Sequence, residues 1–142
     1  MPGSGVLEVL RPYLWLAMIA FLVGFLMECL IGLISFWFLE VSSLIFIFMM
    51  ANYFLSGHMV PLDWLLKLFG DNVELREAGR TGMMLLPFPY LAYFPASIML
   101  GKHSVAATWT HLGVGGIWVL LLLAANRIVF ARGVRRYSAF GG

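Results

Sequence analysis

Four long stretches with almost no charge most constrain what this chain can fold into. Residues 13–39 hold one charged side chain, Glu28, while residues 41–57 and 83–101 hold none, and residues 104–130 hold only Arg127. A helix that crosses a bilayer needs about 20 mostly apolar residues. The first and fourth stretches exceed that length, and the second is near its lower limit. We therefore predict three spanning helices, at about residues 13–39, 41–57 and 104–130.

The composition excludes several classes of protein. The 142 residues are 62% hydrophobic and 11% charged, whereas a soluble domain is about 45–50% apolar and about 25% charged. A chain of this size has too little interior to bury such an excess, which excludes a lone water-soluble domain. The net charge of +2 is too small to indicate nucleic-acid binding, and the single cysteine, Cys29, excludes an internal disulfide. We predict an all-α integral membrane protein, with residues 1–142 forming one membrane domain.

The third uncharged stretch differs from the others because it contains Pro87, Pro89 and Pro95. Proline removes a backbone donor and clashes with the preceding turn, so these residues cannot continue one straight helix. Within hydrocarbon, a broken backbone is tolerated only where protein or a wet cavity covers it. We predict a re-entrant or interfacial element with short helices on either side of the prolines, which are candidate gate elements. A kinked fourth spanning helix is the rival interpretation.

The segment between the second span and these prolines is the most polar part of the chain. Residues 62–69 predict an amphipathic turn or two. Residues 71–82 predict a loop or a short surface helix that ends at Gly79 and Gly82. Together with the proline cluster, this makes residues 59–101 a re-entrant region between the second and third spans.

Basic residues at the end of the chain predict its orientation. Arg132, Arg135 and Arg136 follow the last apolar stretch, and Arg127 can extend toward the same interface. Under the positive-inside rule, this basic tail, residues 131–142, is cytoplasmic. With three spans, the N-terminus and residues 59–101 are then external. An external N-terminus without a cleavable signal is awkward for a complete protein, and we expect that something upstream is missing.

Two polar residues inside the predicted spans are candidate functional contacts. Glu28 would cost roughly 2.5–3.5 kcal/mol in mid-span if charged, so it either lines a pathway or helix interface, or is a protonated or hydrogen-bonded side chain facing a neighbouring helix. Asn52, with Ser56 one turn later, can form a hydrogen bond across helices. Glycines in the last span allow close helix approach: Gly113, Gly115 and Gly116.

No pattern in the sequence indicates catalysis. There is no glycine-rich phosphate loop, and His58, His103 and His111 are too scattered to form a metal-ligand pair on one helix face. We therefore predict no catalytic residues, no metal site and no cofactor, and we do not expect an enzyme.

Four motifs, in order, resemble a known family. They are LISFWFLE, FLSGHMVPLDWL, LLPFPYLAYFPASIMLGK and RGVRRYSAFGG, and they resemble the C-terminal half of a bacterial type-2 ATP-binding-cassette transporter permease over roughly residues 13–142. The resemblance implies a six-span permease in which this chain supplies the fourth to sixth spans, with re-entrant helices on the outer side before the sixth. It also implies a bacterial inner-membrane exporter in which two permeases pair with two ATPase subunits to export a lipid, drug or polymer.

The first three spans of such a permease, and its coupling helix, have no counterpart here. We expect a split gene, a fragment or a reduced descendant. The leading interpretation is a permease component that lines a translocation path without hydrolysing ATP itself, partnered by lipid, other membrane subunits, an ATPase subunit and a second permease protomer. The alternative is a non-catalytic accessory subunit of a larger membrane complex of respiratory or photosynthetic type.

Overall fold

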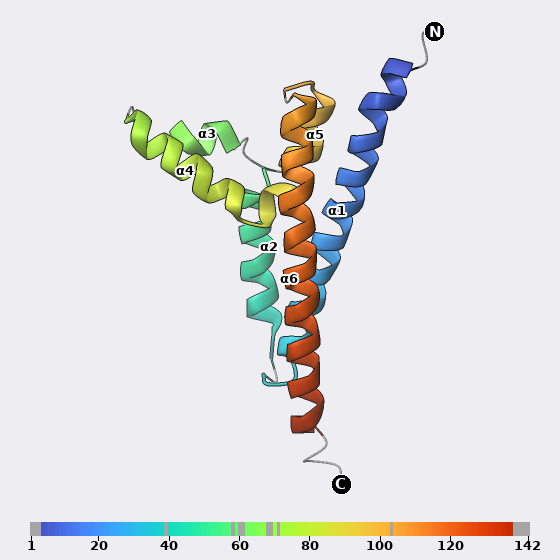
Figure 1. The fold of residues 1–142 in the computed structure, drawn as a ribbon. Helices are drawn as coiled ribbons and strands as arrows, with labels where there is room; N and C mark the ends of the chain where they lie inside the picture. Colours follow the sequence, from blue (N-terminus) through green and yellow to red (C-terminus); the bar gives the residue numbers. More distant parts are fainter. Residues whose placement is uncertain are drawn as a thin grey trace.

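The computed structural model describes residues 4–38, 40–57, 59, 62–67, 70, 72–102 and 104–137. All regular structure in these residues is helical, which confirms the predicted all-α class (Figure 1). The elements in chain order are α1 (Ser4–Ile34), α2 (Ser42–Leu55), α3 (Leu62–Lys67), α4 (Val73–Leu85), the 3-10 helix η1 (Phe88–Tyr90), α5 (Tyr93–Met99) and α6 (Val105–Tyr137).

The helices α1 and α6 are the two longest helices, and they pack against each other. They contain 31 and 33 residues, about 46 Å and about 50 Å at 1.5 Å per residue, against a hydrocarbon core of about 30 Å. Residues Gly5–Ile34 and Ala106–Arg135 are long and apolar enough to cross a membrane. The two helices run in the same direction, and the start of α1 diverges from α6 (Figure 1).

The second predicted span, residues 41–57, forms a shorter helix than α1 and α6. Helix α2 has 14 residues and none of them is buried. Its length is about 21 Å, which is shorter than the hydrocarbon core of about 30 Å that α1 and α6 exceed. Helix α2 contacts η1, and in the view of Figure 1 it lies level with the middle of α6.

The region predicted as re-entrant, residues 59–101, folds into α3, α4, η1 and α5 rather than one continuous helix. Our expectation that Gly79 and Gly82 end a helix is wrong, because α4 continues to Leu85. The helix ends there because Leu86 precedes Pro87 and takes an extended conformation, with ψ 153°. Figure 1 shows α3 and α4 projecting sideways from the bundle as a pair, which we call the α3–α4 hairpin.

The prolines begin the short helices that follow. Pro87 precedes η1 and Pro89 lies within it, while Pro95 lies in the first turn of α5. The amide groups of a first turn have no partner within the helix, so proline is tolerated there. The prolines therefore lie where a helix makes no backbone hydrogen bond through its amides, and the chain changes direction there.

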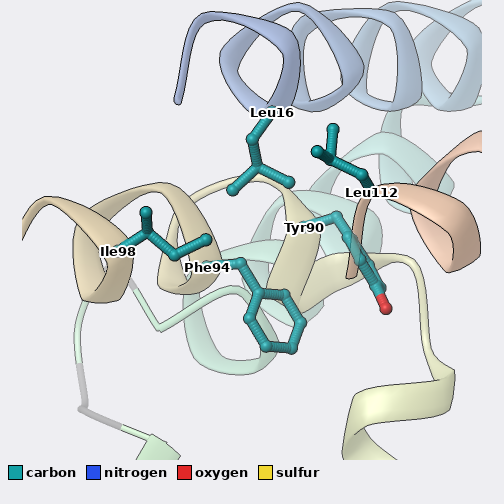
Figure 2. Packing of buried hydrophobic residues seen from close by; sticks show 5 residues of the cluster. All are labelled: Leu16, Tyr90, Phe94, Ile98 and Leu112. Atoms are coloured by element: carbon teal, nitrogen blue, oxygen red, sulfur yellow. The ribbon is translucent and has the colours of Figure 1, made fainter. Parts of the chain in front are cut away.

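The core holds this broken segment against both long helices. One buried cluster joins side chains of α1, η1, α5 and α6 (Figure 2); its members are Leu16, Tyr90, Phe94, Ile98 and Leu112. A second cluster lies further along α1 and α6 and consists of Val23, Leu26, Met27 and Leu122. Tyr90 and Phe94 are almost fully buried, with ring centroids 4.7 Å apart.

One glycine of the three predicted to permit close helix approach lies at such a contact. A Cβ on Gly115 would lie 2.7 Å from Ile19 Cγ2 and 3.2 Å from Tyr90 Cδ1. A Cβ on Gly113 or Gly116 would meet nothing within 4 Å. The tight contact of α1, η1 and α6 therefore depends on Gly115.

Candidate functional site

A cleft on α1 brings two of the predicted site residues together. It has a volume of about 450 Å³ and is lined by Ala17, Ala20, Phe21, Gly24, Phe25, Glu28, Leu91 and Pro95. The six α1 residues recur at spacings of three and four, which places them on one face of the helix. The other wall comes from Leu91, which lies between η1 and α5, and from Pro95 in the first turn of α5. We call this the α1 cleft.

Gly24 sets the width of the α1 cleft. A Cβ at this position would lie 2.8 Å from Leu91 Cδ2. With glycine there, Leu91 packs directly against the backbone of α1. The proline-broken segment is thereby held one side-chain layer closer to α1 than a larger residue would allow.

Glu28 lies in the α1 cleft with its side chain exposed. Within the part of the chain that the structure describes, no hydrogen bond or ion pair reaches its carboxylate. The α1 cleft is otherwise lined mainly by apolar and aromatic side chains. Among the described residues, Glu28 therefore makes no polar contact with another helix of this chain.

The three prolines do not share one site. Pro87 and Pro89 are buried, whereas Pro95 is partly buried and lines the same α1 cleft as Glu28. The structure thus distinguishes two prolines that support the fold from one that faces the cleft.

Asn52 lies on α2, away from the residues that line the α1 cleft. Its backbone carbonyl accepts a hydrogen bond from the Ser56 hydroxyl, and its side-chain Oδ1 is buried with no hydrogen-bond partner among the described residues. The Ser56 carbonyl accepts the Tyr93 N–H at 3.0 Å. Gly57, with φ 83°, turns the chain at this point. The end of α2 is therefore joined to the start of α5.

Asn126 is a polar residue of the last span that the sequence interpretation missed. Its Nδ2 donates to the carbonyl of Leu26 on α1 at 2.9 Å and to that of Leu122 at 2.8 Å. Its Oδ1 is buried without a hydrogen-bond partner in the described chain. The available signal was an amide residue at the end of an apolar stretch, where a side chain of this kind usually bonds across helices.

A second groove, of about 410 Å³, lies on the other side of α1 and includes Cys29, Asn126 and Arg127. Glu28 and Arg127, the two charges inside the predicted spans, therefore line different grooves and do not face one another. The other residues that line this second groove are apolar or glycine: Leu26, Gly32, Leu33, Leu123 and Phe130.

The predicted interface anchors lie on the C-terminal part of α6. The side chains of Arg127, Arg132 and Arg135 are exposed, and that of Arg136 lies outside the described side chains. Residues 131–137 of the predicted basic tail continue α6 as helix. Gly133 packs against Phe36, since a Cβ there would lie 2.6 Å from Phe36 Cδ2. The arginines thus extend from the C-terminal part of α6, which the contact between Gly133 and Phe36 holds in place.

Two aromatic donors fix the C-terminal end of α4. The Tyr90 hydroxyl donates to the Met84 carbonyl at 3.4 Å, and the Trp118 indole N–H donates to the Leu85 carbonyl at 2.9 Å. Carbonyls of a last turn have no partner within their helix. Burial raises the pKa of the Tyr90 phenol to about 12, so this donor stays protonated. The α3–α4 hairpin is thereby attached to η1 and α6.

The described residues include no group of three or more His, Cys, Asp and Glu side chains placed to hold a metal ion. His111 lies instead beside the Phe94 ring, with centroids 4.1 Å apart. The features of the described chain that can serve a function are therefore grooves and contacts between helices.

Comparison with known proteins places the chain in a family. The family model for ABC-2 family transporter proteins matches residues 7–141. Neither the curated proteins nor the solved structures contain a match to the chain. Members of this family are multi-pass membrane subunits of transporters, which agrees with the apolar helices α1 and α6. Because the match covers nearly the whole chain, the protein belongs to the ABC-2 transporter family and is a component of a membrane transporter.

Proposed function

We propose that this chain is the permease component of an ATP-driven exporter in a bacterial inner membrane, corresponding to the C-terminal half of a permease. The family match over residues 7–141 carries the proposal. In this proposal the chain lines a translocation path, hydrolyses nothing itself, and works with an ATPase subunit and a second permease protomer. Its C-terminus is cytoplasmic.

The direction of the helices supports three spans. Contacts between α1 and α6 join Ile19 to Gly115 and Leu26 to Asn126, so the residue numbers increase together and the helices are parallel. Two parallel spans must be joined by a segment that returns across the membrane. Helix α2 supplies this return, with residues 41–57 as the short second span and residues 59–101 as the re-entrant region on the outer side.

The α1 cleft supplies the wall of the proposed path. It is open on one side, and a second subunit placed there would close it into a channel. Glu28 is the charged group of its lining, which also includes Pro95 of the broken segment. A carboxylate within a membrane span is retained where it meets water, a solute or a polar partner, which supports a place on the path.

Purification of the full chain in mild detergent, with identification of the accompanying proteins, tests the assignment. We expect an ATPase subunit to co-purify. Association only with cofactor-bearing subunits of a respiratory or photosynthetic complex would overturn the transport proposal in favour of an accessory role.

The path is tested by Glu28→Gln in the assembled transporter. We expect reduced export with unchanged subunit association, since the variant keeps the shape of the side chain and removes its charge. Glu8→Gln is the matched control, because Glu8 is also exposed on α1 but does not line the cleft. Equal export by wild type and Glu28→Gln would place the path elsewhere.

Accessibility to membrane-impermeant thiol reagents tests the topology. In a Cys29→Ala background, Glu74→Cys should react from outside the cell, and Val134→Cys should react only after the membrane is opened. Both side chains are exposed in the structure, and reaction of Val134→Cys in opened membranes is the control that its failure to react from outside reports the membrane side. Reaction of both from the same side would contradict three spans.

A further inference from the structure

The α3–α4 hairpin encloses a basic hollow that the proposed translocation path does not use. The hollow has a volume of about 290 Å³ and is lined by Leu66, Lys67, Val73, Arg76, Glu77 and Arg80. The two helices pack against each other and project from the bundle (Figure 1).

The charges in this hollow come from one face of α4 and the end of α3. Arg76, Glu77 and Arg80 lie within one helical turn of each other, so their side chains share a face. Lys67 is the last residue of α3. Three cations therefore surround the hollow against one carboxylate. Among the residues that the structure describes, no carboxylate is ion-paired with Lys67, Arg76 or Arg80.

The other side of α4 is apolar. Leu75, Ala78, Gly82 and Leu85 recur at helical spacing on the face opposite Arg76 and Arg80, and all four are exposed. Leu75 is 51% exposed and Leu85 is 61% exposed. Trp64 on α3 is also exposed. A basic face, an apolar face and an exposed tryptophan are typical of a helix that lies in the plane of a membrane–water interface.

The chemistry of the hollow suits a phosphate group. Guanidinium groups bind phosphate oxygens through paired hydrogen bonds, and an ammonium adds a compact positive charge. The hairpin as a whole has four acidic residues against three basic ones, so the positive excess is confined to the lining of the hollow. That local excess favours a headgroup with net negative charge over a zwitterionic one.

We propose that the α3–α4 hairpin lies in the membrane interface and binds the phosphate of an anionic phospholipid headgroup between Lys67, Arg76 and Arg80. The apolar face of α4 contacts the acyl-chain boundary of the same leaflet. This lipid is a resident ligand of the transporter component and is distinct from any exported substrate. Binding requires only the membrane location that the family provides, so it stands apart from the proposed ATP-driven export.

Native mass spectrometry of the purified full chain, titrated with phosphatidylglycerol or phosphatidylcholine, tests the proposal. We expect preferential binding of phosphatidylglycerol. Arg76→Gln and Arg80→Gln should each weaken it by about fivefold, and the double variant by roughly 25-fold. Lys102→Gln is the matched control, since Lys102 is exposed and does not line the hollow. Equal binding of the two lipids, or equal loss in Lys102→Gln and Arg80→Gln, would overturn the proposal.

Two further measurements complete the test: competition by inorganic phosphate, and lipid binding by Glu77→Gln. Inorganic phosphate is the competitor that separates a lipid site from a free-phosphate site. Displacement of phosphatidylglycerol by inorganic phosphate at comparable concentration would overturn the lipid assignment. Glu77→Gln removes the one negative charge of the lining, so binding should strengthen severalfold, and this variant decides the question if the arginine variants fail to fold. Unchanged or weaker binding by Glu77→Gln would contradict the arrangement.

Discussion

Gly115→Ala is the substitution that tests the packing of the core most directly. The added methyl group would lie 2.7 Å from Ile19 Cγ2 and 3.2 Å from Tyr90 Cδ1. Cγ2 is attached to the branched Cβ of Ile19, so it cannot rotate away without moving the side chain, and Tyr90 is only 1% exposed. Overpacking of this kind costs about 1–3 kcal/mol.

A matched control isolates that cost. Replacing glycine by alanine inside a helix also favours the folded state by about 0.8–1.0 kcal/mol through helix propensity. Gly113→Ala carries the same propensity gain on the same helix, but its new methyl group meets nothing within 4 Å. The difference between the two variants removes the propensity contribution. We expect Gly115→Ala to be less stable than Gly113→Ala by about 1–3 kcal/mol.

Reversible unfolding in mixed detergent micelles, with increasing sodium dodecyl sulfate and tryptophan fluorescence as the signal, measures the difference in free energy of unfolding. Ile19→Ala removes the atom that the new methyl group would meet. In a double-mutant cycle it should therefore recover part of the loss in Gly115→Ala. Equal stability of Gly115→Ala and Gly113→Ala would refute the close contact of α1, η1 and α6.

Three further predictions follow from individual contacts. Trp118→Phe removes the indole donor at the end of α4 and should lower the free energy of unfolding by about 1 kcal/mol in the same detergent titration; no loss would contradict the bond. Gly133→Ala should be less stable than Gly32→Ala by about 1–3 kcal/mol, because its methyl group would meet Phe36 while that of Gly32→Ala meets open space. The Tyr90 phenol should ionise near pH 12 instead of 10, so stability falls as pH rises between these values; Tyr90→Phe should remove the last component of the phenolate absorbance titration.

The attachment of α4 links the fold to the proposed lipid site. Tyr90 and Trp118 hold the last carbonyls of α4, and both side chains pack in or beside the main buried cluster. The hairpin therefore projects from a fixed point on the bundle. Loss of either donor should allow the hairpin to change its angle to α6 while the long helices remain packed.

Much of the secondary structure could be predicted from local chemistry. Uncharged stretches long enough to cross a bilayer predicted the presence of α1 and α6, because length and apolarity depend on the segment itself. The bounds were less accurate: α1 runs over Ser4–Ile34 where a span at 13–39 was predicted, and α6 over Val105–Tyr137 where 104–130 was predicted. The prolines predicted a broken segment, because proline removes a donor wherever it lies. The prediction was wrong at Gly79 and Gly82, where α4 continues, because one glycine weakens a helix by only about 1 kcal/mol and contacts at its end outweigh that cost.

The sequence by itself determined the class of the protein, the places of the long helices, the break at the prolines and the resemblance to its family. Only the tertiary structure decided which glycine of three lies at a helix contact, that Glu28 shares a cleft with Pro95, that Asn126 bonds to α1, and that α3 and α4 enclose a basic hollow. Helix formation depends on neighbours within a few residues. These juxtapositions depend on how α1, α6 and the broken segment align in space, and side chains remote in the chain set that alignment when they pack.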